Sequence, residues 1–240
     1  MTAIDPKQSD LPRHLVIIPD GNRRWATKRR LEPWQGHEAG AENTERLIRE
    51  ARRLGVREIS FWGSSLENLT KRPALESKAL LRIYEIYFKK LLENGDIHKD
   101  RAKIRFIGHW EEQFPESLKS VLRECLKATK TYDQYFLNFF LAYSGDDEMR
   151  LAFEQVARSL PTGERVTNEM IKANLMTKDL PPVDLLIRTG GEPHLSAGFM
   201  MWDMANTQLF FSEKLYPDFD EAALRSALED YVGRGRRFGK

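Results

Sequence analysis

The residues best suited to chemistry follow the apolar run Leu15–Pro19, which stops at Asp20-Gly21-Asn22. Cationic side chains flank this run or follow it closely: Arg13, Arg23, Arg24, Lys28, Arg29 and Arg30. The run predicts a buried strand, and Gly21 permits a tight turn. A helix that begins near Asn22 would offer free N–H groups to an anion. The carboxylate of Asp20 is a ligand type that Mg²⁺ prefers, so the segment predicts a phosphate and metal site. Spacing alone would favour the alternative, a helix cap beside a solvated basic face.

A second segment near residue 190 has the same organisation. Val183–Ile187 predicts another buried strand, which delivers Arg188 to the loop Thr189-Gly190-Gly191. Further polar side chains follow this loop: Glu192, His194 and Ser196. Because open α/β sheets bind ligands at the carboxyl ends of their strands, we expect the two segments to form one site.

The composition is that of one large soluble domain, residues 13–240, preceded by a flexible arm over residues 1–12. The net charge of +2 gives no indication of nucleic-acid binding, because the positive charge is local. The only cysteine, Cys125, lies in an amphipathic pattern that indicates core packing, and a single thiol suits the cytoplasm. The sequence has no predicted membrane span, so we expect at most peripheral contact with a membrane.

Alternating apolar and amphipathic segments predict an α/β fold around a central, mostly parallel, six-stranded sheet. The predicted strands are Leu15–Pro19, Ile59–Trp62, Ile104–Ile107, Tyr135–Tyr143, Val183–Ile187 and Gln208–Phe211. The predicted helices are Arg23–Arg30, Glu38–Leu54, Leu75–Glu93, Glu116–Thr129, Glu148–Leu160, Asn168–Leu175 and Glu221–Tyr231. Thr167 and Asp220 are predicted N-caps.

Several motifs in order give the chain a family resemblance. DGNRRW precedes GH-x-x-G, and IRTGGE precedes Ser-x-x-Phe-x-x-Trp and Tyr-Pro-Asp-Phe. From His14 to Phe238 the chain resembles the cis-prenyltransferases of the undecaprenyl diphosphate synthase type. The resemblance implies surrounding helices, an apolar substrate tunnel, a homodimer and dependence on Mg²⁺. It also implies condensation of isopentenyl diphosphate with an allylic diphosphate, such as farnesyl or geranyl diphosphate, to form cis double bonds and release pyrophosphate.

The resemblance assigns roles to individual residues. The allylic diphosphate would meet Gly21, Asn22, Arg23, Arg24, Trp25 and His37, and the isopentenyl diphosphate would meet Arg188, His194 and Ser196. Asp20 would bind Mg²⁺ and assist the departure of pyrophosphate. The segment FWGSSLENLTKRP resembles a family substrate loop, with Ser64, Ser65, Asn68 and Arg72 as the counterparts. His37 and Asn68 would be polar partners for condensation and proton removal.

The sequence departs from the family pattern at Pro33, His194 and Gln208, and Ala197-Gly198 adds one residue between Ser196 and Phe199. Pro33 stands where relatives often have an arginine, so Arg29 or Arg30 would have to supply that phosphate contact. His194 also replaces an arginine. Gln208 aligns with a glutamate that is a magnesium ligand in relatives, and it would bring an oxygen ligand but no charge.

Two alternatives to an active, magnesium-dependent enzyme follow from these observations. A non-catalytic partner subunit is favoured by Pro33, His194 and Gln208 and opposed by the intact first motif. A nucleotide-binding α/β protein ranks last, because the sequence has neither a P-loop nor Gly-x-Gly-x-x-Gly.

Product length and the role of the C-terminus also stay open. The apolar face of Leu75–Glu93 could be a core wall or a tunnel wall. Trp62, Phe139 and Phe140 could shorten a tunnel or simply pack in the core. The basic ending, Arg234–Lys240, resembles a family segment near the dimer interface and the active site.

Overall fold

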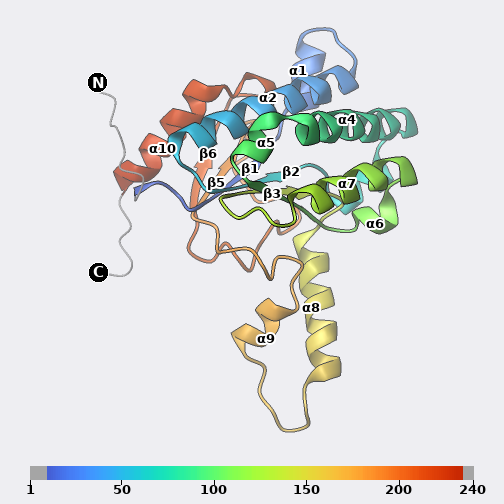
Figure 1. The fold of residues 1–240 in the computed structure, drawn as a ribbon, viewed down its shortest axis with the longest axis vertical. Coiled ribbons are helices and arrows are strands. Elements are labelled where there is room, and N and C mark those ends of the chain that lie inside the picture. The colour runs from blue at the N-terminus through green and yellow to red at the C-terminus, as the bar shows by residue number, and fades with distance from the viewer. Residues whose placement is uncertain (1–9, 235–240) are drawn as a thin grey trace.

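The computed structural model describes residues 10–234, which fold around one six-stranded sheet (Figure 1). The strands are β1 (His14–Ile18), β2 (Glu58–Trp62), β3 (Ala102–Ile107), β4 (Tyr135–Phe140), β5 (Leu185–Arg188) and β6 (Gln208–Phe211). Their order is β3-β4-β2-β1-β5-β6, and all five pairings are parallel. The predicted α/β class and parallel sheet are therefore confirmed.

The burial of the strand residues explains why apolar runs in the sequence predict the strands. Every residue of β1, β2 and β5 is buried, so each of these central or near-central strands is rich in apolar residues. The edge strand β6 is only partly buried. Because the order β2-β1-β5 places β1 at the centre, the loop that follows Ile18 lies between the loops of its two neighbours.

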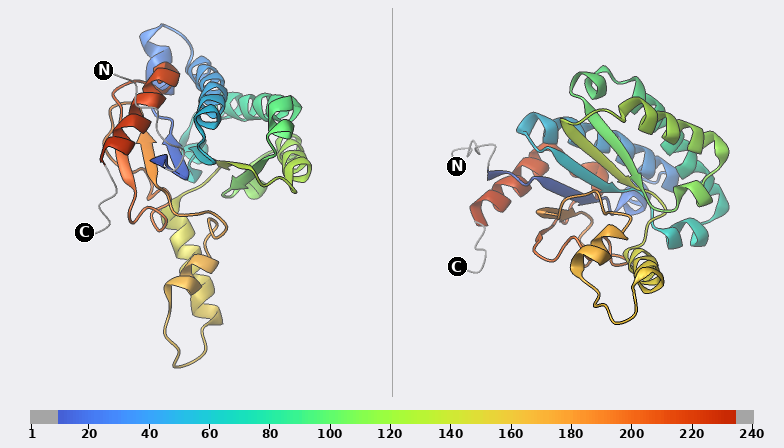
Figure 2. Two further views of the ribbon diagram at one scale, coloured as in Figure 1. Left: turned by 60° about the vertical axis from the view of Figure 1, so that its left-hand side comes forward. Right: turned by 60° about the horizontal axis from the view of Figure 1, so that its bottom comes forward.

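Helices cover one face of the sheet and project from the other. The helices are α1 (Asn22–Lys28), α2 (Pro33–Leu54), α3 (Leu66–Lys71), α4 (Ala74–Glu93), α5 (Gly95–Lys99), α6 (Trp110–Gln113), α7 (Glu116–Thr129), α8 (Gly145–Ser159), α9 (Asn168–Ala173) and α10 (Glu221–Arg234). Helices α10, α2, α4 and α7 form one layer over the larger hydrophobic core (Figure 1). Helices α8 and α9 extend away from this body as a separate projection (Figure 2).

The seven predicted helices are all present, with small differences at their ends. Helix α2 begins at Pro33 rather than Glu38, because Glu32 and Gln35 form a capping box around a proline that suits the first turn. The Thr167 hydroxyl accepts from Met170 N at 3.3 Å, and the Asp220 carboxylate accepts from Ala223 N at 2.9 Å. Both predicted N-caps are therefore confirmed. The sequence did not predict α3, α5 or α6.

The core accounts for Cys125 and for the end of the predicted arm. Cys125 is fully buried, and burial raises the pKa of its thiol to about 12, so the prediction of core packing is confirmed. Leu11, which the sequence placed in the arm, packs into the larger core instead. The predictions for residues 1–9 of the arm and for residues 235–240 of the basic ending concern residues outside 10–234. Within 10–234, no helix is long and apolar enough to cross a bilayer.

Candidate active site

The first loop of the site connects β1 to α1. Gly21 has a φ of 107°, and a Cβ atom there would lie 2.8 Å from Leu215 Cδ2, so glycine is required for both conformation and space. No side chain caps the N-terminus of α1. Asp20 is therefore not a helix cap, and the free N–H groups of α1 remain available to an anion.

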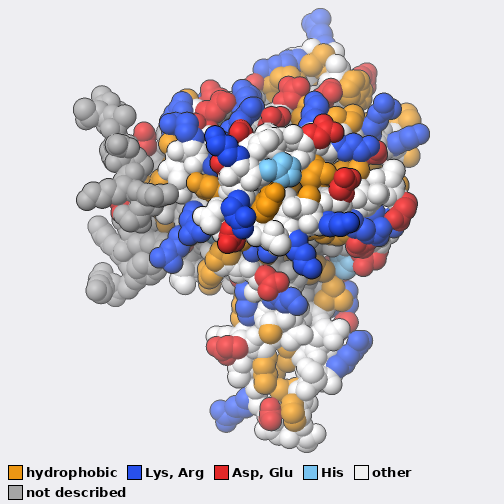
Figure 3. All heavy atoms as spheres, in the orientation of Figure 1, with side chains coloured by type: hydrophobic (Ala, Val, Ile, Leu, Met, Phe, Trp, Pro, Cys, Tyr) orange, Lys and Arg blue, Asp and Glu red, His pale blue; other side chains and the backbone are white. Residues whose placement is uncertain are grey.

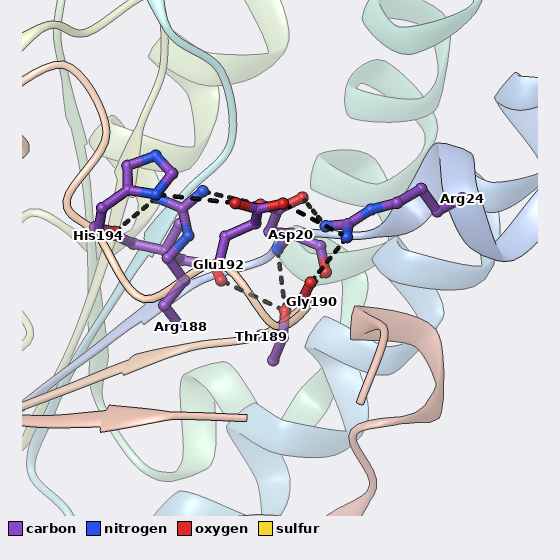
Figure 4. Close-up of polar contacts among 8 residues, drawn as sticks. Asp20, Arg24, Arg188, Thr189, Gly190, Glu192 and His194 are labelled. Carbon is purple, nitrogen blue, oxygen red and sulfur yellow. Dashed lines mark hydrogen bonds and ion pairs between the residues drawn. The ribbon is translucent and has the colours of Figure 1, made fainter. Parts of the chain in front are cut away.

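Asp20 lies between two arginines that come from different motifs (Figure 4). Its Oδ1 is 3.0 Å from Arg24 Nη2, and its Oδ2 is 2.8 Å from Arg188 Nη2. The parallel pairing of Ile18 with Arg188 brings the two loops together. The Thr189 hydroxyl also donates to the carbonyl of Asp20 at 2.8 Å. The expected meeting of the two segments at one edge of the sheet is confirmed.

An open cleft lies in front of this loop, and most of its charged side chains are cationic. It is lined by Pro19, Asp20, Gly21, Asn22, Arg23, Arg24, Thr27, Lys28, His37 and Arg72. Further lysine and arginine side chains cover the tip of the α1–α2 hairpin (Figure 3). With one carboxylate among four cations and a helix N-terminus, the cleft is suited to a polyvalent anion.

An apolar pocket continues from the cleft, because both share Pro19, Asn22 and His37. The pocket lies between α2 and α4, and it is lined by Ala41, Phe61, Trp62, Leu80, Ile83, Tyr84, Tyr87, Phe88, Phe139 and Leu141. The apolar face of α4 is thus a pocket wall as well as a core wall. The joined cavities suit an amphiphile with an anionic head and an apolar chain.

Only part of the predicted aromatic barrier lines this pocket. Phe139 does so and Trp62 lies at the pocket's edge, but the rings of Trp62 and Phe140 both pack on Phe199, 4.9 and 4.8 Å away, in the smaller core. Successive strand residues point to opposite faces of a sheet, so Phe139 and Phe140 cannot both face the pocket.

The GH-x-x-G motif brings α1 against α2. Gly36 and Gly40 are four residues apart and so lie on one face of α2. A Cβ atom on Gly36 would lie 2.1 Å from the carbonyl oxygen of Asn22, and one on Gly40 would lie 2.6 Å from Asn22 Oδ1. The two glycines therefore position Asn22, whose buried Oδ1 has no partner within the described part of the chain.

His37 is buried where the cleft meets the pocket. Its Nε2 lies 3.2 Å from Oε1 of Glu76, a residue that sequence reasoning missed. Burial, followed by the positive charge of Arg72, lowers the pKa of His37 well below its usual value, so the ring is neutral at pH 7. Glu76 follows Arg72 by four residues, which was a weak signal, because a glutamate in an amphipathic helix is usually solvated.

In the second loop, Arg188 is better placed than His194 to bind an anion. Arg188 is 5% exposed, donates from Nη1 to the main-chain oxygen of His194 at 2.7 Å, and has no partner for Nε among described residues. The ring of His194 is exposed and lies 3.9 Å from Glu192. Ser196 is partly buried in the same loop.

Among its described side chains, the candidate substrate loop contributes only Arg72 to the walls of the cleft. Ser64 accepts from Ala142 N at 3.0 Å, and Ser65 caps α3 by accepting from Asn68 N at 2.9 Å. Asn68 is exposed on α3. Nη1 of Arg72 is buried and has no partner within residues 10–234, so it is available to a ligand.

The residues expected to compensate for Pro33 lie outside the walls of the cleft. Arg29 stacks on the Trp25 ring at 4.1 Å and pairs with Asp218 at 3.1 Å. Trp25 Nε1 also donates to Asp218 at 2.7 Å. Neither Trp25, Arg29 nor Arg30 lines the cleft, whereas Lys28 and Arg72 do. Lys28 and Arg72 therefore replace Arg29 and Arg30 as candidates for the phosphate contact that Pro33 cannot make.

The structure separates Gln208 from Asp20. Gln208 pairs with Leu185 at the amino end of the sheet, whereas Asp20 follows the carboxyl end of β1. Asp203, a carboxylate five residues earlier in the sequence, forms a salt bridge with Lys172 at 2.5 Å. It is therefore equally unsuited to bind a metal ion at Asp20. Within one chain, the arrangement therefore does not support the predicted metal role of Gln208.

Asp20 alone is compatible with a magnesium site that is completed by substrate. Among residues 10–234 there is no cluster of three or more side chains of the kinds that hold a metal ion. Mg²⁺ is commonly held by one or two carboxylates together with substrate phosphates and water. The half-buried carboxylate of Asp20, at the edge of a cationic cleft, fits that arrangement.

Comparisons with known proteins agree with this geometry. Residues 18–239 match a family model described as "Putative undecaprenyl diphosphate synthase". The chain is 33% identical over 238 residues to a tritrans,polycis-undecaprenyl-diphosphate synthase (geranylgeranyl-diphosphate specific) of Pyrococcus horikoshii, covering 98% of this chain and 89% of the relative. It is 36% identical over 237 residues to a ditrans,polycis-undecaprenyl-diphosphate synthase ((2E,6E)-farnesyl-diphosphate specific) of Pseudomonas putida, covering 97% and 92%. The crystal structure of lavandulyl diphosphate synthase from Lavandula x intermedia, in complex with dimethylallyl diphosphate, superimposes with a TM-score of 0.89 at 29% identity, covering 97% of this chain and 100% of that one.

Proposed function

The chain belongs to the undecaprenyl diphosphate synthase family of prenyltransferases, and we propose that it condenses isopentenyl diphosphate with an allylic diphosphate to form a cis-polyprenyl diphosphate. The observation that carries this proposal is the cationic cleft that opens into an apolar pocket. One ligand with a diphosphate head and a prenyl chain fills both spaces. Catalysis would then depend on positioning and electrostatic stabilisation.

The allylic diphosphate binds with its head in the cleft and its chain in the pocket. The N–H groups of α1 and the guanidinium groups of Arg23, Arg24 and Arg72 neutralise its negative charge. The chain then lies between α2 and α4, where the pocket excludes water from the prenyl group. Asn22 and His37 stand at the junction of head and chain, near the bond that must break.

Isopentenyl diphosphate binds at Arg188, with Ser196 and His194 nearby. Both substrates compete with Asp20 for its two arginines, so diphosphate binding releases the Asp20 carboxylate. The family uses Mg²⁺, and Asp20 would hold it together with diphosphate oxygens. When bound there, the ion supplies positive charge to the departing pyrophosphate.

Condensation joins the isopentenyl double bond to the allylic carbon while the bond to pyrophosphate breaks. A proton must then leave the isopentenyl unit. His37 is neutral and borders the pocket, so it can accept that proton. The side chain of Asn68 has no basic atom, so it cannot accept the proton. We limit its proposed role to a hydrogen bond with the substrate.

The runner-up is a non-catalytic partner subunit of such an enzyme. Pro33, His194 and Gln208 favour it. The assembled Asp20–Arg24–Arg188 cluster favours the active enzyme, because binding a catalytic partner would not require that cluster. We also propose a homodimer in the cytoplasm, with at most peripheral membrane contact.

Direct turnover tests the proposed function. The purified protein is incubated with isopentenyl diphosphate, Mg²⁺ and dimethylallyl, geranyl, farnesyl or geranylgeranyl diphosphate, and the products are identified by mass spectrometry. We expect prenyl diphosphates longer than the primer, with cis geometry in every added unit. No elongation with any primer would favour the non-catalytic subunit.

Replacing Arg188 with alanine is expected to weaken isopentenyl diphosphate selectively. Losing a charge-assisted, bidentate contact should raise the KM for isopentenyl diphosphate about tenfold or more and should change the KM for the allylic substrate little. Arg72→Ala, which changes a residue that lines the cleft, is the matched control and should weaken the allylic substrate more. Steady-state kinetics with each substrate varied in turn measures both. Equal effects of Arg188→Ala on the two KM values would contradict the assignment of separate sites.

A further inference from the structure

Glu76 is a buried carboxylate beside the cleft that the proposed chemistry does not use. It lies in the first turn of α4 and is 8% exposed. Its Oε1 is 3.2 Å from His37 Nε2, 3.5 Å from Arg23 Nε and 3.9 Å from Arg72 Nε. One oxygen atom therefore connects residues from α1, α2, α4 and the end of α3.

Burial makes this arrangement informative. A buried carboxylate is costly unless hydrogen bonds and opposite charges compensate it. Here the N-terminus of α4 and two guanidinium groups provide that compensation. If Glu76 served only to begin α4, an exposed position in the same turn would suffice, as at Leu75, which is 84% exposed.

We propose that Glu76 is a positioning residue that fixes the ring of His37 through Nε2 and restrains Arg23 and Arg72 at the cleft. This proposal rests on the proposed function and adds a residue to it. A carboxylate accepts hydrogen bonds, so the neutral ring must carry its proton on Nε2. Nδ1 is then the acceptor, and no described residue bonds to it. The nitrogen left free is the one that can receive a proton from substrate.

The same carboxylate weakens the attraction of the cleft for anions. Its negative charge lies within salt-bridge distance of Arg23 and Arg72, which face the diphosphate. A diphosphate must compete with Glu76 for these two side chains. Removing the charge should therefore strengthen diphosphate binding while it impairs the chemistry, and a purely structural residue would not produce opposite effects on these two quantities.

The test compares Glu76→Gln with Glu76→Asp. Glutamine has nearly the same volume but no charge and can donate as well as accept, so the orientation of His37 is no longer fixed. We expect kcat to fall about 10- to 100-fold. The affinity for inorganic pyrophosphate, measured by calorimetry, should rise about threefold or more as the two arginines are released. Aspartate keeps the charge but is one methylene shorter, so kcat should fall while pyrophosphate affinity stays near that of the wild type.

Glu93→Gln, an exposed position on the same helix, is the matched control and should change neither quantity. An unchanged kcat in Glu76→Gln, or a parallel loss of kcat, pyrophosphate affinity and melting temperature, would overturn the positioning role. The pyrophosphate measurement needs no turnover. If wild-type protein elongates no primer, the proposed function fails, yet calorimetry still shows whether Glu76 restrains the arginines.

Discussion

Replacing Asp20 with alanine should reduce turnover by about a thousandfold or more, because the substitution removes the only carboxylate among residues 10–234 that lines the diphosphate cleft. Positioned charge at a developing leaving group is among the largest contributions to catalysis. The fold should persist, because the Asp20 side chain is 29% exposed and caps no helix. Losing the pair with Arg24, whose side chain is exposed, costs little. Buried Arg188 loses one partner but keeps its bond to His194 O.

The variant also separates binding from chemistry. Asp20→Ala frees both arginines, so the affinity for inorganic pyrophosphate should be unchanged or higher even though product formation is lost. Single-turnover product formation, calorimetry and circular dichroism on one preparation measure the three quantities. Asp133→Ala, an exposed aspartate paired with Arg101, is the control and should retain activity. Turnover near the wild-type level in Asp20→Ala would contradict the assigned role.

The sequence predicted the position of this carboxylate because the central strands are buried on both faces. Such strands appear as apolar runs, and their ends mark the loops at the edge of the sheet. Asp20 and Arg188 each follow or end such a run, so they could be assigned to one site although 168 positions separate them. The parallel pairing of β1 with β5 then brings their side chains into contact.

Contacts made by side-chain packing could not be predicted in the same way. Glu76 looked like one polar residue of an amphipathic helix, and only the approach of α4 to α2 places it against His37. Trp25 belongs to the first motif, yet its ring nitrogen is bound by Asp218, from a distant turn. Gln208 obtained a metal role from its place in a motif, whereas strand register decides which end of the sheet it occupies. Helices α3, α5 and α6 are too short to give a clear period.

Replacing Gly36 with alanine should impair both the fold and the activity. The added Cβ would lie 2.1 Å from the carbonyl oxygen and 2.8 Å from the carbonyl carbon of Asn22. Both are backbone atoms in the first turn of α1, so a side-chain rotation cannot relieve the clash. Helix α1 must move away from α2, and overpacking of this kind costs about 1–3 kcal/mol or more. A shift of about 1 Å in the diphosphate loop should lower kcat/KM about a hundredfold.

Two further glycines show whether the loss comes from the clash itself. In Gly40→Ala the new Cβ meets the side-chain oxygen of Asn22 at 2.6 Å, so the side chain can move while the backbone stays. This variant should remain nearly as stable as the wild type and should lose affinity mainly for the allylic substrate. Gly95→Ala is the control, because a Cβ on Gly95 has no neighbour within 4 Å.

Thermal unfolding and steady-state kinetics on the three variants together test the packing of α1 on α2. The expected order of damage is Gly36→Ala, then Gly40→Ala, then Gly95→Ala, because the first displaces backbone, the second a side chain and the third nothing. Wild-type stability and activity in Gly36→Ala would mean that α1 does not pack this closely on α2. The diphosphate loop would then owe its position to Gly21 and the Asp20–Arg188 contact alone.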